Sequence, residues 1–200
     1  MGNIILPKKF NFNNVKGISK NQLEQHYKLY EGYVRKTNEI WKESEELNDF
    51  KGSNTTYSKV RSLKLGESYA LDGVKLHELY FENMNCKSNI PYGHIMKLIE
   101  RDFGSYERFV KYFISVGMAM RGWCVLTIEP LDEKLHIIGQ DAHDVGSIWM
   151  SNPLLVLDVY EHAYMIDFGI NRLEYINIFM KNINWKVVNS RLKKYEVRMI

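Results

Sequence analysis

The chain has 200 residues with a formal net charge of +3, and its 45% hydrophobic and 26% charged residues are the usage of a folded protein of one domain or of two small domains. Aromatic residues make up 13%, which excludes collagen-like, low-complexity and disordered classes. The small, dispersed positive charge does not indicate a nucleic-acid partner. The most apolar long stretch, 112–126, contains Arg121 and is too short to cross a bilayer, so we expect no membrane association.

The first ten residues, MGNIILPKKF, have no positively charged region ahead of their short apolar run and no small-residue cleavage site. We therefore expect no secretory signal and a cytoplasmic protein. The chain has two cysteines, Cys86 and Cys124, and no CxxC pair. Two reduced thiols fit a cytoplasmic protein, and a disulfide between them is the alternative.

Helical periodicity dominates the first half of the chain. Ser19 followed three residues later by Gln22 resembles a capping box that opens a helix. Apolar residues then recur at three- and four-residue steps to about Leu47. A loop is expected over 48–56, and a second helical pattern runs from Val60 to Met84. Two long helices with a short connection predict an antiparallel hairpin.

The segment 85–93, dense in Asn, Pro and Gly, predicts a boundary between domains 1–89 and 90–200. Helices are expected over 94–103 and 105–120. Strand formers then predict strands at 123–129, 134–138 and 153–159, the first two joined by a hairpin loop, before helical periodicity returns at Glu161. The fold class is therefore α+β: an N-terminal antiparallel helical hairpin, then a C-terminal mixed domain with a small three-stranded antiparallel sheet and flanking helices.

Four residues have side chains suited to a metal ion. Asp158 and His162 stand four residues apart at a predicted strand-to-helix junction, where they can converge on one point. His26 and His77 lie on the apolar faces of the two long helices. Each histidine alone is equally a core residue hydrogen-bonded to its neighbours. Together the four form a set of three nitrogens and one oxygen, which suits iron or manganese.

The chain resembles the iron/manganese superoxide dismutases over nearly its whole length. The segment DVYEHAYMIDFG (158–169) resembles the family signature D-V-W-E-H-A-Y, with Tyr160 in place of the usual Trp. HELYFENM (77–84) resembles the H-x-x-F-W segment of the second helix, and LEQHYKLYEGYV (23–34) resembles the first-helix block. Three further segments match in character and order: IERDFGSYERF (99–109), RGWCVL (121–126) and NINWKVVNSRL (182–192).

The resemblance implies an enzyme that converts superoxide into dioxygen and hydrogen peroxide. It implies one iron or manganese ion per subunit, bound by His26, His77, Asp158 and His162. It also implies a homodimer in which Glu161 reaches across the interface to the partner's His162. Tyr164 and Trp123 match family positions around the active site, although either is otherwise a plain core aromatic.

One glutamine bears on the choice of metal. Gln140 resembles the family's glutamine that hydrogen-bonds the metal-bound solvent. Iron enzymes often supply this glutamine four residues before the second histidine ligand, where this chain has Gly73. The combination of Gly73 and Gln140 favours manganese over iron. His94 and His136 have no role in this interpretation, and His143 is a minor candidate for a place beside Gln140.

The first-helix block departs from the family pattern. Family members usually carry a histidine four residues after the first ligand and a tyrosine eight after it. This chain has Tyr30 at the first position, and its Tyr33-Val34 pair arrives one residue early. Positions four and seven after His26 lie within about 40° of it on a helix, so we predict Tyr33 as the gateway tyrosine rather than Val34. We predict Tyr30 as the substitute for the histidine, beside the metal cavity and affecting the interface contact to Tyr164.

Two alternatives to an active dismutase follow from this departure. The first is a catalytically weak homologue that keeps the metal for a structural or interaction role. The second is a metal-free helical interaction protein in which the histidines only pack. The ordered set of His, His, Asp and His argues against the second, because packing does not require it.

Overall fold

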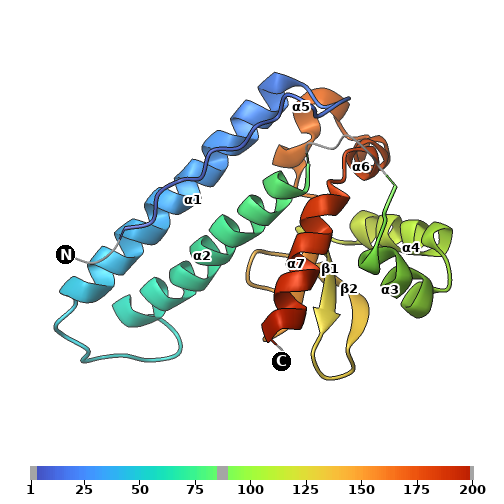
Figure 1. The fold of residues 1–200 in the computed structure, drawn as a ribbon. Coiled ribbons are helices and arrows are strands. Elements are labelled where there is room, and N and C mark those ends of the chain that lie inside the picture. The colour runs from blue at the N-terminus through green and yellow to red at the C-terminus, as the bar shows by residue number, and fades with distance from the viewer. Residues whose placement is uncertain (1–3, 85–89, 199–200) are drawn as a thin grey trace.

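The structure, a computed structural model, describes residues 4–84 and 90–198. Two long helices, α1 (Lys20–Glu46) and α2 (Lys59–Asn83), lie side by side at the N-terminal end as the predicted hairpin (Figure 1). The predicted domain boundary lies in the segment 85–93, of which 85–89 are outside the described residues, so the division into domains 1–89 and 90–200 stays a prediction.

Both hairpin helices begin at a serine whose hydroxyl caps the first turn. The Ser19 Oγ accepts a hydrogen bond from the main-chain N–H of Gln22 at 3.0 Å, and Ser58 does the same for Arg61 at 3.2 Å. Each serine satisfies one of the N–H groups that a helix leaves unpaired at its start. The sequence prediction of a cap at Ser19 is therefore confirmed, and α1 continues unbroken for 27 residues.

The second half is built on a small sheet. Two helices, α3 (His94–Phe103) and α4 (Tyr106–Ala119), lead into β1 (Trp123–Glu129), β2 (Lys134–Gln140) and β3 (Asn152–Asp158). The strand order is β2-β1-β3, and both neighbours of β1 run antiparallel to it. The predicted α+β class and three-stranded antiparallel sheet are confirmed.

The helical stretch expected after Glu161 is divided into four elements. They are a short 3₁₀ turn η1 (Glu161–Ala163), then α5 (Met165–Phe168), α6 (Arg172–Lys181) and α7 (Trp185–Arg198). Gly169, at φ +53°, ends α5 in a backbone conformation that favours glycine. The resulting turns fold α5 and α6 back toward the start of α1, as Figure 1 shows.

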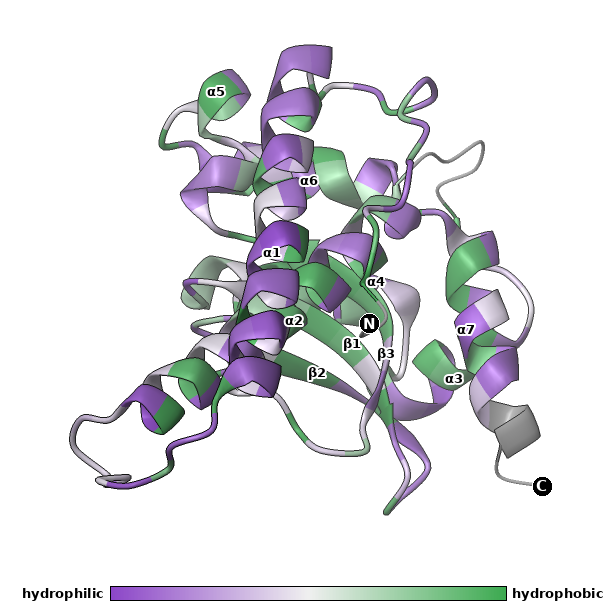
Figure 2. Ribbon diagram, turned by 90° about the vertical axis from the view of Figure 1, so that its left-hand side faces the viewer, coloured by the Kyte–Doolittle hydropathy of each residue, from purple (hydrophilic) through white to green (hydrophobic). Residues whose placement is uncertain are grey.

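One continuous apolar core joins the two halves of the chain. The central strand β1 is buried at six of its seven residues, and α2, α4 and α7 pack on the sheet. Figure 2 shows hydrophobic colour along much of β1, with hydrophilic residues facing outward on α1. Within 4–84 and 90–198, no helix combines the length and the apolar character needed to cross a membrane.

The register of the sheet determines where polar side chains meet. Trp123, the first residue of β1, pairs with the last residue of each neighbour, Gln140 on β2 and Asp158 on β3. The start of β1 and the ends of β2 and β3 therefore lie together at one end of the sheet. The segments that follow β2 and β3 both start at this end of the sheet, directly after Gln140 and Asp158.

Candidate metal centre

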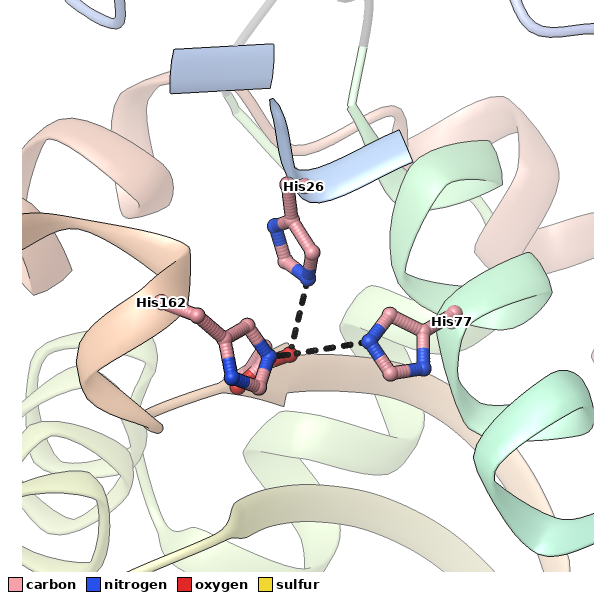
Figure 3. A group of neighbouring side chains, drawn as sticks. His26, His77 and His162 are labelled. Atoms are coloured by element: carbon pink, nitrogen blue, oxygen red, sulfur yellow. Dashed lines mark hydrogen bonds and ion pairs between the residues drawn. The ribbon is translucent and has the colours of Figure 1, made fainter. Parts of the chain in front are cut away.

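Four side chains from four elements converge beside this end of the sheet: His26, His77, Asp158 and His162 (Figure 3). The Asp158 Oδ2 atom lies 3.1 Å from His26 Nε2, 3.2 Å from His162 Nε2 and 3.7 Å from His77 Nε2. One ligand atom from each residue lies within 4.8 Å of all the others. The helices of the hairpin supply two of these residues, and the end of β3 with η1 supplies the other two. Residues 132 positions apart in sequence are thus in direct contact.

Three members of the cluster, His26, His77 and Asp158, are buried and have the protonation states that metal binding requires. Burial lowers the pKa of His26. Burial and the neighbouring His26 hold the pKa of His77 well below its ordinary value, so both rings are neutral near pH 7. Burial opposes the ionisation of Asp158, but His162 and His26 outweigh it and hold the pKa of Asp158 well below its usual range. Neutral imidazoles and an ionised carboxylate are the forms that bind a metal ion.

The hydrogen bond of His77 leaves its Nε2 atom available to bind a metal ion. The Nδ1–H of His77 donates to the carbonyl oxygen of Gly73 at 2.6 Å, so the Nε2 of the neutral ring carries a lone pair. That Nε2 atom is buried and has no hydrogen-bond partner among the described residues. The Nε2 atoms of His26 and His162 lie 3.1 and 3.2 Å from Asp158 Oδ2. Three imidazole nitrogens and one carboxylate oxygen form a donor set that fits iron or manganese.

An aromatic wall lies beside the cluster. The Tyr33 ring lies 5.3 Å from the ring of His77 and 4.8 Å from that of His143. Because α1 is unbroken, Tyr33 stays on the same side of the helix as His26, while Val34 is buried in the apolar core. Burial and a hydrogen bond with Tyr69 raise the pKa of Tyr33, so its hydroxyl stays protonated at neutral pH.

His143, only a minor candidate from the sequence, lies in direct contact with the residues around the cluster. The indole Nε1–H of Trp123 donates to His143 Nδ1 at 3.0 Å, and the His143 ring lies 5.7 Å from that of His77. Burial lowers the pKa of His143 to about 4, so the ring is neutral and its proton is on Nε2. This buried N–H has no partner within residues 4–84 and 90–198. The available signal was the loop after the second strand, which returns toward the start of the first.

Gln140, the glutamine singled out from the sequence, ends β2 directly beside Trp123. Its side chain is buried, and its Oε1 is without a hydrogen-bond partner in the described part of the chain. It is His143 that packs against Tyr33 and His77. The role expected for Gln140 stays a prediction, and His143 is a second candidate for that role.

Gly73 makes this packing possible. A Cβ atom added there would lie 3.1 Å from the Tyr33 ring and 3.3 Å from His143 Cδ2. Any side chain at this position must displace one ring or the other. Gly73 therefore lets α2 approach the two rings closely, and a larger side chain there would require these rings to move.

Three further predicted residues lie as follows. Tyr30 is fully buried, and its hydroxyl donates to Glu78 at 2.9 Å and accepts from the main-chain N–H of Lys8 at 2.8 Å. Its polar partners thus belong to its own chain. Tyr164 is buried and accepts a hydrogen bond from Arg172 at 3.1 Å. Glu161, by contrast, has a side chain that is 60% exposed.

Three histidines and one aspartate, at the junction of a helical hairpin and a small antiparallel sheet, form a cluster that could hold one metal ion in an α+β protein. Comparison with known proteins agrees with this class. Residues 91–191 match the family model of iron/manganese superoxide dismutases, C-terminal domain. The chain is 40% identical over 185 residues to the superoxide dismutase [Fe] of Aquifex pyrophilus, which covers 90% of this chain and 87% of the relative.

Manganese-named relatives also match. The superoxide dismutase [Mn] of Haloarcula marismortui is 33% identical over 172 residues, covering 86% of this chain and 81% of the relative. The superoxide dismutase [Fe] of Methanothermobacter thermautotrophicus is 35% identical over 182 residues, with 88% and 87% covered. This chain belongs to the iron/manganese superoxide dismutase family, as the sequence motifs predicted.

Proposed function

We propose that this protein is a superoxide dismutase, which converts two superoxide anions and two protons into dioxygen and hydrogen peroxide with one iron or manganese ion per subunit. The observation that carries the proposal is the convergence of His26, His77 and His162 on Asp158 Oδ2. Relatives named superoxide dismutase along most of the chain support the same conclusion.

The bound ion would supply the one-electron exchange, because none of the ligands is itself redox-active. We assign the ligand roles to His26, His77, Asp158 and His162 on their mutual distances and protonation states. Three neutral imidazoles and one carboxylate contribute a single negative charge, which balances part of the charge of the ion and so influences its reduction potential.

Proton supply falls to the groups beside the cluster. The product needs two protons, and two hydrogen-bond donors lie next to His77: the hydroxyl of the half-buried Tyr33 and the buried Nε2–H of His143. The Tyr33 hydroxyl keeps its proton at neutral pH because burial raises its pKa. The His143 ring is neutral there, because burial lowers its pKa to about 4, and it keeps a single N–H at Nε2. We infer that they hydrogen-bond the solvent and substrate at the site, with Trp123 fixing the orientation of His143.

The choice of the active metal, iron or manganese, is a separate part of this proposal. The sequence argument for manganese depends on Gly73 combined with Gln140. The contacts of Gly73 support half of it, since an added side chain there would press on the rings of Tyr33 and His143. The other half depends on Gln140. It is weakened because His143, which packs against Tyr33 and His77, is a second candidate for the role expected of Gln140. We keep manganese as the prediction, to be decided by the activity of iron- and manganese-loaded samples.

We also propose a homodimer whose interface includes Glu161. Its carboxylate is exposed, and His162 is the one member of the cluster with an exposed side chain, at 30%. Exposed apolar residues surround this segment: Met165, Ile166, Ile170 and Leu173. Sedimentation at micromolar concentration is expected to show a dimer that a Glu161→Arg substitution weakens, whereas a monomer in the parent protein would contradict the interface. The predicted cytoplasmic location stays a prediction.

The test of the function is metal content measured together with superoxide consumption. The purified protein is expected to hold about one iron or manganese per chain and to consume superoxide in proportion to its metal. His77→Ala is expected to lose both, whereas His136→Ala, which removes a histidine paired with Asp132 on the surface, is expected to lose neither. A parent protein that binds metal without activity would instead support the catalytically weak homologue.

A further inference from the structure

Two buried side chains from distant elements hold the main chain at the two ends of the segment 158–162. The first is Gln22 on α1, whose amide Nε2–H donates to the carbonyl oxygen of His162 at 2.6 Å. The Gln22 Oε1 accepts from the main-chain N–H of Ile166 at 3.0 Å. Gln22 is fully buried. Its amide therefore ties η1 and the start of α5 to the helix that carries His26.

The second is Tyr175 on α6. Its hydroxyl donates to the carbonyl oxygen of Asp158 at 2.8 Å. Because its proton is used there, the hydroxyl of Tyr80, 3.0 Å away, donates to the Tyr175 oxygen. Both tyrosines are fully buried, and the Tyr80 ring lies 5.1 Å from that of His26. The end of β3 is thus linked to α6 and, through Tyr80, to α2.

We propose that Gln22 and Tyr175 are positioning residues of the metal centre, which hold the carbonyl groups of His162 and Asp158 so that both side chains reach the ion together. The inference rests on the proposed function, since it takes these two residues as ligands. The capping box predicted at Ser19 needs a Gln22 side chain that turns back to its own helix start. Instead, Gln22 reaches 140 residues along the chain, to the main chain of a ligand.

Local bonds cannot do this alone. The main-chain N–H of Tyr160 donates to Asp158 Oδ1 at 2.9 Å and orients the carboxylate within its own segment. That bond moves with the segment and does not fix it relative to His26 and His77 on the hairpin. A site needs its ligands held within about 0.5 Å of the productive geometry. Hydrogen bonds from α1 and α6 fix the segment 158–162 relative to other helices, which a bond within the segment cannot do.

The test compares two variants with two matched controls. Gln22→Met and Tyr175→Phe remove the two groups at nearly constant volume. Asn182→Leu removes another buried amide that joins distant segments, by bonds to the main chain of Lys16 at 2.7 and 2.8 Å. Tyr195→Phe removes a buried hydroxyl that has no hydrogen-bond partner among the described residues. Both controls lie on other parts of the core.

The readouts are the rate of Mn²⁺ release to excess EDTA from the manganese-loaded protein and the visible absorption spectrum of the Co²⁺-loaded protein. Loss of a group that orients a ligand typically costs 10- to 100-fold in metal affinity. We expect Gln22→Met and Tyr175→Phe to release Mn²⁺ at least about 10-fold faster and to shift the Co²⁺ bands. The controls should release Mn²⁺ at the parent rate with the parent spectrum, even where their melting temperature falls.

Release rates and spectra of Gln22→Met and Tyr175→Phe that match the controls would overturn the inference. If either variant does not fold, milder changes take its place and are read in the same way. Gln22→Asn keeps a neutral amide but shortens its reach to His162 and Ile166, and Tyr80→Phe removes the bond that supports Tyr175. A parent protein that binds neither Mn²⁺ nor Fe²⁺ would count against the proposed function itself, which distinguishes the two failures.

Discussion

The indole nitrogen of Trp123 donates a hydrogen bond to Nδ1 of His143 at 3.0 Å. This bond determines which nitrogen of the neutral, buried imidazole carries the proton. The Nε2–H then lies beside the four candidate ligands and has no hydrogen-bond partner among the described residues. Trp123 starts the buried central strand, so the orientation of His143 is set by a residue paired with both neighbouring strands.

The first prediction concerns His143. His143→Leu removes both the acceptor for Trp123 and the donor beside the cluster, and we expect activity to fall about 10- to 100-fold with metal content unchanged. His143→Gln keeps an acceptor and a donor in one side chain, so it should retain most of the activity. Activity per bound metal is the measurement. Equal activities for the Leu and Gln variants would show that the N–H of His143 has no role.

Gly73 gives a prediction with a matched control on the neighbouring helix. An alanine Cβ at position 73 would press on the rings of Tyr33 and His143, so Gly73→Ala should lower activity without loss of metal. At Gly32, an added Cβ would meet only the end of the Arg35 side chain, at 3.7 Å. Gly32→Ala should therefore leave activity unchanged and raise the free energy of unfolding by about 0.5–1 kcal/mol, the helix-propensity difference. Thermal unfolding and a superoxide assay measure both effects.

Tyr33 and Tyr30 should behave differently when each loses its hydroxyl. Tyr33→Phe removes a donor beside His77, so activity or its pH dependence should change while metal content and stability hold. Tyr30→Phe leaves the N–H of Lys8 and the carboxylate of Glu78 without this partner. That variant should lose about 1–3 kcal/mol of the free energy of unfolding. A Tyr33→Phe enzyme identical to the parent across the pH range would remove Tyr33 from the site.

The metal-free protein should lose stability as the pH falls below about 6.5. Burial holds the pKa values of His26 and His77 below their ordinary value, so the folded chain stays unprotonated where the unfolded chain takes up protons. The free energy of unfolding then decreases as pH falls from 6.5 toward the folded-state pKa values. Urea unfolding of the metal-free protein at pH 8, 7, 6 and 5 measures the slope. A His77→Gln variant should show a shallower slope, and an unchanged one would contradict this origin.

Much of the site could be predicted from the sequence because its signals are local. Asp158 and His162 stand in one short motif, and His26 and His77 each lie on the apolar face of a strongly periodic helix. Apolar periodicity states which side of a helix turns inward, so the four residues had to face the same core. The unbroken α1 likewise put Tyr33 on the side of His26, as counting along the helix indicated.

What only the tertiary structure decided are the partners of the buried polar groups. The sequence predicted Gln22 for a capping box and Tyr30 for a place beside the metal cavity. In the structure Tyr30 bonds to Lys8 and Glu78, and Gln22 bonds to the main chain of His162. His143 came against Trp123 because an irregular segment follows β2. A buried donor or acceptor must find a partner, but its choice depends on which distant segment folding brings within about 3 Å. Sequence spacing determines the direction of a side chain on its own helix or strand, and it contains no information on what another element presents there.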